Sequence, residues 1–232
     1  MGRRRGAEPP PERPQAAIVS LTFDDGLASQ RIAGELLHAR GLTGTFYVSS
    51  GLVGRAGRLG WDDLRALADQ GHEIGGHTRS HVHLPELAAD AARREIEADR
   101  AALLEHDLDP VTFAYPYGEA GAELESMVGD AGYAAARGIG GIIETVPPEN
   151  VLRLRAPHSP RRWTTPEQLT ALVHVAEHEG GWMIVPFHHI ELDGKVGSSY
   201  TTEPSQLEEF LDWLLARGAQ VARVRDIVAG AF

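Results

Sequence analysis

The sequence predicts an α/β protein, a single domain built as a distorted (β/α) barrel of about seven parallel strands. Strand-like and helix-like segments alternate along the chain, which is the pattern of a parallel sheet covered by helices. The first strand-like segment, 17–23, is an apolar, β-branched run and the seventh, 182–187, is strongly apolar, as strands buried on both faces are. No linker interrupts this alternation. A doubly wound open sheet is the competing prediction, and both folds place working residues at the carboxyl ends of strands.

The elements are justified by periodicity and by their end signals. Apolar residues recur at helical spacing in 29–40, and Gly41 ends that helix. Thr165 is a good N-cap for the helix that follows it, with Pro166 at the first position. The expected helices are 29–40, 61–70, 84–104, 123–131, 165–179 and 205–217. The expected strands are 17–23, 44–49, 72–76, 111–115, 133–136, 151–155, 182–187 and 219–224.

Composition narrows the function classes. The chain has 232 residues, enough for one large α/β domain. Its formal net charge is −11, from 22 basic and 33 acidic residues, which argues against nucleic acid as a partner. The absence of cysteine excludes disulfides and thiolate metal sites, so any metal must be held by histidine and carboxylate.

The N-terminal residues 1–16 read as a disordered leader rich in arginine and proline. No apolar segment follows them as in a signal peptide, and no stretch is long enough for a membrane span. We therefore expect a cytoplasmic protein from the sequence as it stands, or a secreted one if the natural chain is longer. Residues 17–232 form the expected domain.

Two adjacent carboxylates, Asp24 and Asp25, follow the first apolar segment and precede Gly26. The glycine permits a turn, and a turn can direct the side chains of neighbouring residues into one pocket. Two unpaired carboxylates repel each other, and one would protonate unless positive charge lay nearby. A divalent metal would supply that charge.

His77 and His81 follow the third expected strand at a spacing of four residues. This spacing lets two imidazoles face the same way if the segment makes one helical turn. With one carboxylate they form a facial donor set that leaves coordination positions open, as catalytic divalent sites do. Two surface histidines beside a glycine turn are the alternative, so the metal interpretation depends on the pair occurring together with Asp24 and Asp25.

Two later segments end strands with functional side chains. Residues 115–118, Tyr-Pro-Tyr-Gly, suit a groove wall for a sugar ring, with backbone N–H groups exposed for an oxyanion. A tight turn with packed tyrosines is the simpler interpretation of that segment alone. His188 follows Phe187 at the end of the seventh strand, where it can act as a general acid or serve a structural role.

Four segments resemble, in their order along the chain, the motifs of the polysaccharide deacetylase family. This family is also called carbohydrate esterase family four, or NodB-homology domains. The segments are 22–26 (TFDDG), 77–81 (HTRSH), 115–118 (YPYG) and 187–188 (FH). The resemblance covers nearly all of residues 17–232 and implies a catalytic domain of that kind. It implies a distorted (β/α) barrel that removes N- or O-acetyl groups from glycans. It also implies a divalent metal, Zn²⁺ first, with Co²⁺, Ni²⁺ or Mn²⁺ as alternatives.

The resemblance also assigns roles. Asp25, His77 and His81 would be the metal ligands. Asp24 would be the general base that deprotonates the metal-bound water, which attacks the acetyl group. The backbone N–H of Tyr117 would stabilise the oxyanion together with the metal.

His188 would be the general acid that protonates the leaving amine or alkoxide. The residues expected to contact the substrate are Tyr115, Pro116, Trp163 and Phe187.

The sequence departs from the family pattern in three places. Ala114 stands where an arginine usually pairs with the catalytic base, so we expect Arg137 or Arg155 to reach Asp24, and the predicted strand end at 155 favours Arg155. Around 161–163 no acidic residue is available to orient the catalytic histidine. Pro186 replaces the leucine that usually lines the acetyl pocket, which puts acetate specificity in doubt.

These observations predict a metal-dependent hydrolase that deacetylates a carbohydrate. A metal-dependent amidohydrolase of a small, intracellular N-acylated metabolite is a second hypothesis, since the pocket and the third motif are altered. A catalytically weak sugar-binding module is the third. The expected partner is thus an acetylated glycan or a small acetylated substrate, with no nucleic acid and no membrane span. The oligomeric state is left open.

Overall fold

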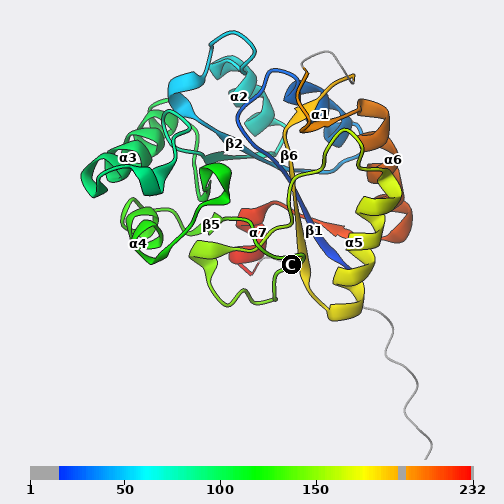
Figure 1. Cartoon of the computed structure of the whole chain (residues 1–232). Coiled ribbons are helices and arrows are strands. Elements are labelled where there is room, and N and C mark those ends of the chain that lie inside the picture. The colour runs from blue at the N-terminus through cyan, green and yellow to red at the C-terminus, as the bar shows by residue number, and fades with distance from the viewer. Residues whose placement is uncertain (1–15, 193–196, 231–232) are drawn as a thin grey trace, which may run out of the picture.

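The computed structural model describes residues 16–192 and 197–230 as a curled parallel sheet surrounded by helices (Figure 1). The strands of the main sheet are β1 (Ile18–Phe23), β2 (Thr45–Val48), β3 (Glu73–Gly76), β4 (Thr112–Ala114), β5 (Ala135–Arg137), β6 (Trp182–Phe187) and β9 (Gln220–Val221). Their order is β5-β4-β3-β2-β1-β6, and β9 pairs with the start of β1. All of these pairs are parallel. The predicted α/β barrel-like domain is therefore confirmed.

Strand β1 is the centre of the sheet. It is hydrogen-bonded to β6 along its whole length, from Ile18 opposite Trp182 to Phe23 opposite Phe187. On its other side it pairs with β2 at Thr22 and Phe23. Because the carboxyl ends of parallel strands meet at one edge of the sheet, the residues after β1, β3, β5 and β6 reach the same region.

The longer helices cover the outside of the sheet (Figure 1). They are α1 (Gln30–His38), α2 (Trp61–Asp69), α3 (Ala89–Glu105), α4 (Ala122–Asp130), α5 (Pro166–Glu179) and α6 (Pro204–Arg217). Between them and the sheet lies a core of buried apolar side chains, in which Phe23 stacks on both Phe46 and Phe187. The predicted segment 84–104 divides into a short 3₁₀ turn, η2 (Leu84–Glu86), and α3.

The predicted strand 151–155 is wrong. Asn150 accepts a hydrogen bond from the N–H of Leu152 at 3.0 Å, and this cap favours a 3₁₀ turn, η4 (Val151–Arg153). Only Leu154 pairs with the sheet, through one bridge to Arg137 of β5. Glu144 bridges Trp182 of β6. Residues 138–154 therefore connect the two end strands of the curled sheet, β5 and β6, through one bridge to each.

The last predicted strand, 219–224, is correct only at Gln220 and Val221. A short helix, α7 (Val224–Val228), begins at the final residue of that prediction. Two further strands of two residues each, β7 (His189–Ile190) and β8 (Thr201–Thr202), form a separate parallel pair that the sequence did not indicate. The remaining 3₁₀ turns are η1 (Ser50–Leu52) and η3 (Pro116–Gly118).

The predicted leader 1–16 lies outside the described residues, apart from Ala16. Within the described part of the chain, no helix is both long enough and apolar enough to cross a membrane.

Candidate active site

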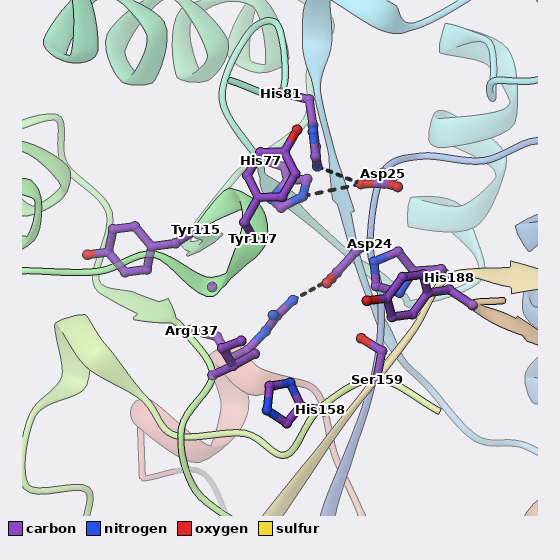
Figure 2. Close-up of a pocket in the computed structure, with 13 residues that line it drawn as sticks. Asp24, Asp25, His77, His81, Tyr115, Tyr117, Arg137, His158, Ser159 and His188 are labelled. Carbon is purple, nitrogen blue, oxygen red and sulfur yellow. Dashed lines mark hydrogen bonds and ion pairs between the residues drawn. The ribbon is translucent and has the colours of Figure 1, made fainter. Parts of the chain in front are cut away.

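The end of β1 places two carboxylates at the carboxyl edge of the sheet. The N–H of Asp24 donates to the carbonyl of Phe187 at 2.9 Å and so extends the β1–β6 ladder by one residue. Asp25 and Gly26 then take positive φ angles of 79° and 61°, which turn the chain sharply. Arg58 donates to the carbonyl of Asp25 and holds this turn. As a result, adjacent residues present their carboxylates to one pocket (Figure 2).

Asp25, His77 and His81 converge on one point. Their ligand atoms lie within 4.8 Å of one another. Asp25 Oδ1 is 3.4 Å from Nε2 of His77 and 3.0 Å from Nε2 of His81, as the dashed lines in Figure 2 show. A four-coordinate ion held at about 2.1 Å separates neighbouring donors by about 3.4 Å. The spacing of the three donors fits a divalent cation.

The protonation pattern of His77 also fits a metal ligand. Its Nδ1 donates to the carbonyl of Ala114 at 2.7 Å, which leaves the lone pair of Nε2 facing the Asp25 carboxylate. Asp25 Oδ1 is buried and accepts no well-directed hydrogen bond within the described residues. Two acceptor atoms that face each other in a buried place require a cation or a proton between them. The donor set therefore suits a bound metal ion.

Electrostatics support the same grouping. Burial alone would raise the pKa of Asp25, but the His77 and His81 imidazoles outweigh burial and lower that pKa. Burial alone would lower the pKa of His77, but the Asp25 and Asp24 carboxylates outweigh it and raise that pKa. The Asp25 carboxylate and the His77 imidazole thus stabilise each other's charged form.

Helix α3 holds the histidine-bearing loop in place. Asp99 of α3 is fully buried and accepts a hydrogen bond from the N–H of His77 at 2.9 Å. Its other oxygen accepts from the N–H of Ser50 at 2.8 Å, so one carboxylate fixes the loops after β2 and β3. Gly76 permits this approach, because a Cβ there would lie 2.8 Å from the Asp99 carboxylate and 2.0 Å from the Tyr133 hydroxyl.

The loop itself is strained. Thr78 and His81 have φ angles of 61° and 55°, which few residues with a side chain adopt. The Thr78 hydroxyl accepts from the N–H of His81 at 3.0 Å, and Glu95 of α3 accepts from Ser80 and Arg79. These bonds hold the strained loop backbone in place and so help to position the His77 and His81 imidazoles.

Arg137, not Arg155, reaches Asp24. The Arg137 guanidinium at the end of β5 forms a buried ion pair with the Asp24 carboxylate (Figure 2). Arg155 instead pairs with the buried Glu144 carboxylate at 2.9 Å, so the expectation that Arg155 orients Asp24 is corrected. The reason is register. Arg137 lies directly opposite Ala114 on the neighbouring strand, so it stands one strand away from the position where the family arginine is expected.

The carboxylates and histidines line a pocket that His188 closes on one side. His188 stands next to Asp24 in Figure 2, and burial lowers the pKa of its imidazole. Its Nδ1 is buried and has no hydrogen-bond partner within the described residues, which agrees with the missing acidic partner in the sequence. Its ring packs against Tyr200, with ring centroids 5.3 Å apart.

Tyr117 lies over the opposite side of the pocket. Its ring stacks on His83 with centroids 3.6 Å apart and meets the His81 ring edge-on at 4.8 Å. Its φ angle is 60°, so stacking on both histidines helps to hold a strained backbone. The oxyanion role of its N–H stays a prediction.

Two of the four expected substrate contacts, Phe187 and Pro116, are corrected. Tyr115 lines the pocket, although it is 1% exposed, points away from the cluster in Figure 2 and donates to the Leu152 carbonyl at 2.9 Å, so its contact with substrate stays a prediction. Phe187 is fully buried between β1 and the helices, because its strand position faces the core. Pro116 is buried and does not line the pocket. Trp163 is 61% exposed and stays available to a ligand.

The pocket also contains residues that the sequence did not single out: His158, Ser159, Ile139 and Tyr200. They come from loops outside the recognisable segments, so no local pattern marked them. Arg137 is different, because it directly follows the fifth expected strand. The sequence indicates it beside Arg155 as a candidate partner of Asp24, and the strand-end argument applies to it as well.

Comparisons with known proteins agree with the family that the sequence motifs resemble. The family described as polysaccharide deacetylase matches residues 12–136, more than half of the chain. No curated protein matches the sequence.

Among solved structures, a family 4 carbohydrate esterase from Streptomyces lividans in complex with acetate is 19% identical; the alignment covers 89% of this chain and 91% of that chain, with a TM-score of 0.60. The peptidoglycan deacetylase PdaC from Bacillus subtilis is 19% identical, with 93% and 91% covered and a TM-score of 0.63. The Xyl-CE4 domain of a multidomain xylanase from the hindgut metagenome of Trinervitermes trinervoides is 17% identical, with 93% and 91% covered and a TM-score of 0.64. At these identities, the likeness shows a shared fold.

Proposed function

Because the chain belongs to the polysaccharide deacetylase family, we propose that it is a metal-dependent hydrolase that removes N- or O-linked acetyl groups from a carbohydrate. One observation carries the proposal. The three candidate ligands Asp25, His77 and His81 share a pocket with a buried carboxylate, Asp24, and a histidine, His188. Such a set supplies a metal site, a base and an acid within reach of one scissile bond.

Asp25, His77 and His81 would hold the ion. A divalent cation there, Zn²⁺ first, would polarise the acetyl carbonyl and lower the pKa of the attacking water. Asp24 would take the proton from that water. The ion pair with Arg137 fixes the orientation of the Asp24 carboxylate, which a base requires.

Tyr117 and His188 would serve the other half of the reaction. The Tyr117 N–H would donate to the oxyanion that develops from the acetyl carbonyl. His188 would give a proton to the leaving amine or alkoxide, so that the C–N or C–O bond breaks without releasing a strong base. The two side chains line the same pocket as Asp24.

The experiment compares metal-free and metal-loaded protein. Chelator-treated protein should release no acetate from N-acetylglucosamine oligomers or acetylxylan. Reloading with Zn²⁺, Co²⁺, Ni²⁺ or Mn²⁺ should restore release and identify the preferred ion.

Asp25→Ala and His77→Ala should lose both bound metal and activity by at least about 1,000-fold, as loss of a catalytic metal does. His178→Ala is the matched control, because His178 is an exposed histidine far along α5. Equal acetate release by metal-free protein would contradict the mechanism. Release only from small N-acetylated metabolites would favour the second hypothesis. Metal and sugar binding without release from any substrate would indicate a binding module.

A further inference from the structure

We propose that Arg161, together with Tyr200 and Trp163, forms a subsite for a negatively charged group on the sugar part of the substrate. The inference rests on the proposed function and narrows its substrate class to acidic acetylated carbohydrates, with a carboxylate as the expected charged group.

The subsite adjoins the leaving-group side of the pocket. Tyr200 lines the pocket and packs against His188, the proposed general acid. The Arg161 guanidinium carbon lies 4.3 Å from the centroid of the Tyr200 ring and 5.8 Å from that of Trp163. The guanidinium and the His188 imidazole therefore contact the same aromatic ring. Because the leaving group is the sugar amine or alkoxide, a charge recognised here belongs to the sugar and not to the acyl group.

The guanidinium is held in position but is not neutralised. Arg161 donates to the Ser199 hydroxyl at 3.2 Å and to the Tyr200 hydroxyl at 3.0 Å. Within residues 16–192 and 197–230, no carboxylate forms an ion pair with it. Arg155 and Arg217, by contrast, are each held by a carboxylate. A pre-ordered guanidinium that keeps free donors loses little entropy when it binds a carboxylate through two hydrogen bonds.

The surrounding charges favour an anion. The pocket is lined by two carboxylates, of which Asp24 is paired with Arg137 and Asp25 faces two imidazoles. The described pocket wall adds no further acidic side chain, although the whole chain has a net charge of −11. A local cation beside compensated carboxylates raises the local concentration of an anionic ligand.

The aromatic rings favour a sugar as the carrier of that charge. Trp163 is 61% exposed and Tyr200 is 38% exposed, although both are large aromatic residues that usually lie buried. Their exposed parts offer apolar surface to the C–H groups of a pyranose ring. A cation that contacts two such rings suits a sugar ring that carries a carboxylate.

A structural role for Arg161 makes a different prediction. If its hydrogen bonds only tie the 158–164 loop to the residues before β8, then loss of Arg161 should weaken activity on neutral and acidic substrates alike. Two variants separate these cases. Arg161→Gln removes the charge but keeps a hydrogen-bonding amide, and Arg161→Lys keeps the charge but loses the fork geometry.

The test uses oligomers that share a glycan backbone and differ in the acidic groups that they carry. Metal-loaded protein is assayed for acetate release from an N-acetylglucosamine pentamer, from the same pentamer oxidised to carboxylates at C6, and from an oligomer that carries lactyl carboxylates at O3 on alternate sugars. The quantity compared is the ratio of kcat/KM for each acidic oligomer to that for the neutral one. Arg65→Gln, an exposed arginine on α2, is the control.

We expect the native protein to prefer at least one acidic oligomer and Arg161→Gln to lower that ratio about 10-fold, as loss of a charge-assisted hydrogen-bonded pair does. Arg161→Lys should keep more of the preference than Arg161→Gln. Added salt should reduce the preference in the native protein but not in Arg161→Gln. No acidic preference, or an equal loss on all oligomers, would overturn the subsite. Absence of acetate release from every oligomer would instead refute the proposed function.

Discussion

The two sides of the pocket are built differently. On the candidate metal side, hydrogen bonds hold the backbone of all three ligands, and Asp99 joins two loops through one buried carboxylate. On the leaving-group side, His188 has a buried Nδ1 that forms no hydrogen bond to a described residue, and its ring packs against Tyr200, which lies in the loop just before the two-residue strand β8.

The difference matches the demands of the chemistry. A metal site needs its ligands placed within a few tenths of an ångström, so the chain accepts strained backbone at Thr78 and His81 to position them. A leaving-group side must admit a substrate and determine which one fits. A fold that keeps the metal side and varies the leaving-group side can carry out one reaction on different substrates.

Removal of Arg137 tests this difference between the two sides with the largest expected loss of activity and stability. Arg137→Ala leaves the Asp24 carboxylate buried without its partner, which costs about 3–5 kcal/mol when a buried pair is broken. We expect acetate release to fall by about 100- to 1,000-fold and the urea midpoint of unfolding to fall as well.

The double variant Ala114→Arg/Arg137→Ala tests whether the charge itself matters. Because residues 114 and 137 are register partners, a guanidinium at 114 should restore part of the activity. Full activity in Arg137→Ala alone would show that Asp24 does not need this arginine.

The leaving-group side is tested next by His188→Gln. Loss of a general acid should lower kcat by about 100-fold while metal content stays unchanged, because His188 is not a candidate ligand. Metal analysis and steady-state acetate release together check this. A drop in activity accompanied by loss of metal would mean that the two sides are not independent.

The clamp on the metal side predicts a smaller effect. Asp99→Asn weakens the acceptors for the N–H groups of His77 and Ser50 and should lower metal affinity about 10- to 100-fold. Competition with a chromophoric chelator measures this affinity without an activity assay. Glu97→Gln, an exposed residue of the same helix, is the matched control. Unchanged affinity in Asp99→Asn would show that the strained loop holds its shape without α3.

The stability of the protein should depend on pH through His72, which directly precedes β3 on the metal side. Burial lowers the pKa of His72 to about 4, from 6.5 for an exposed histidine. The folded protein therefore favours the neutral imidazole, and the unfolded chain binds more protons between these two pH values. Stability should fall by about 1–2 kcal/mol as pH falls from 7 to 5.

His72→Asn keeps an acceptor for the Gly44 N–H and should remove this part of the pH dependence. Urea titrations at pH 7, 6 and 5 for both proteins give the comparison. An identical pH slope in the variant would assign the acid sensitivity to other groups.

The sequence anticipated most of the architecture because its signals are local. Strand-like segments between glycine and proline turns marked the six strands on the main path of the sheet, and the Thr165 cap marked the start of α5. It missed segments whose structure depends on distant partners. Residues 151–155 have apolar side chains of the kind a strand has. The Asn150 cap nevertheless favours a 3₁₀ turn there, and only Leu154 forms a bridge to the sheet.

The sequence by itself determined which side chains stand at the ends of β1, β3 and β6, because strand ends follow from hydrophobic pattern and glycine turns. Only the tertiary structure decided that Arg137 meets Asp24 while Arg155 turns to Glu144. It also decided that Tyr115 and Phe187 belong to the core and that Arg161 stands beside Tyr200. These outcomes depend on register and on which side chain fills a shared interior, and both arise from contacts between residues far apart in the chain.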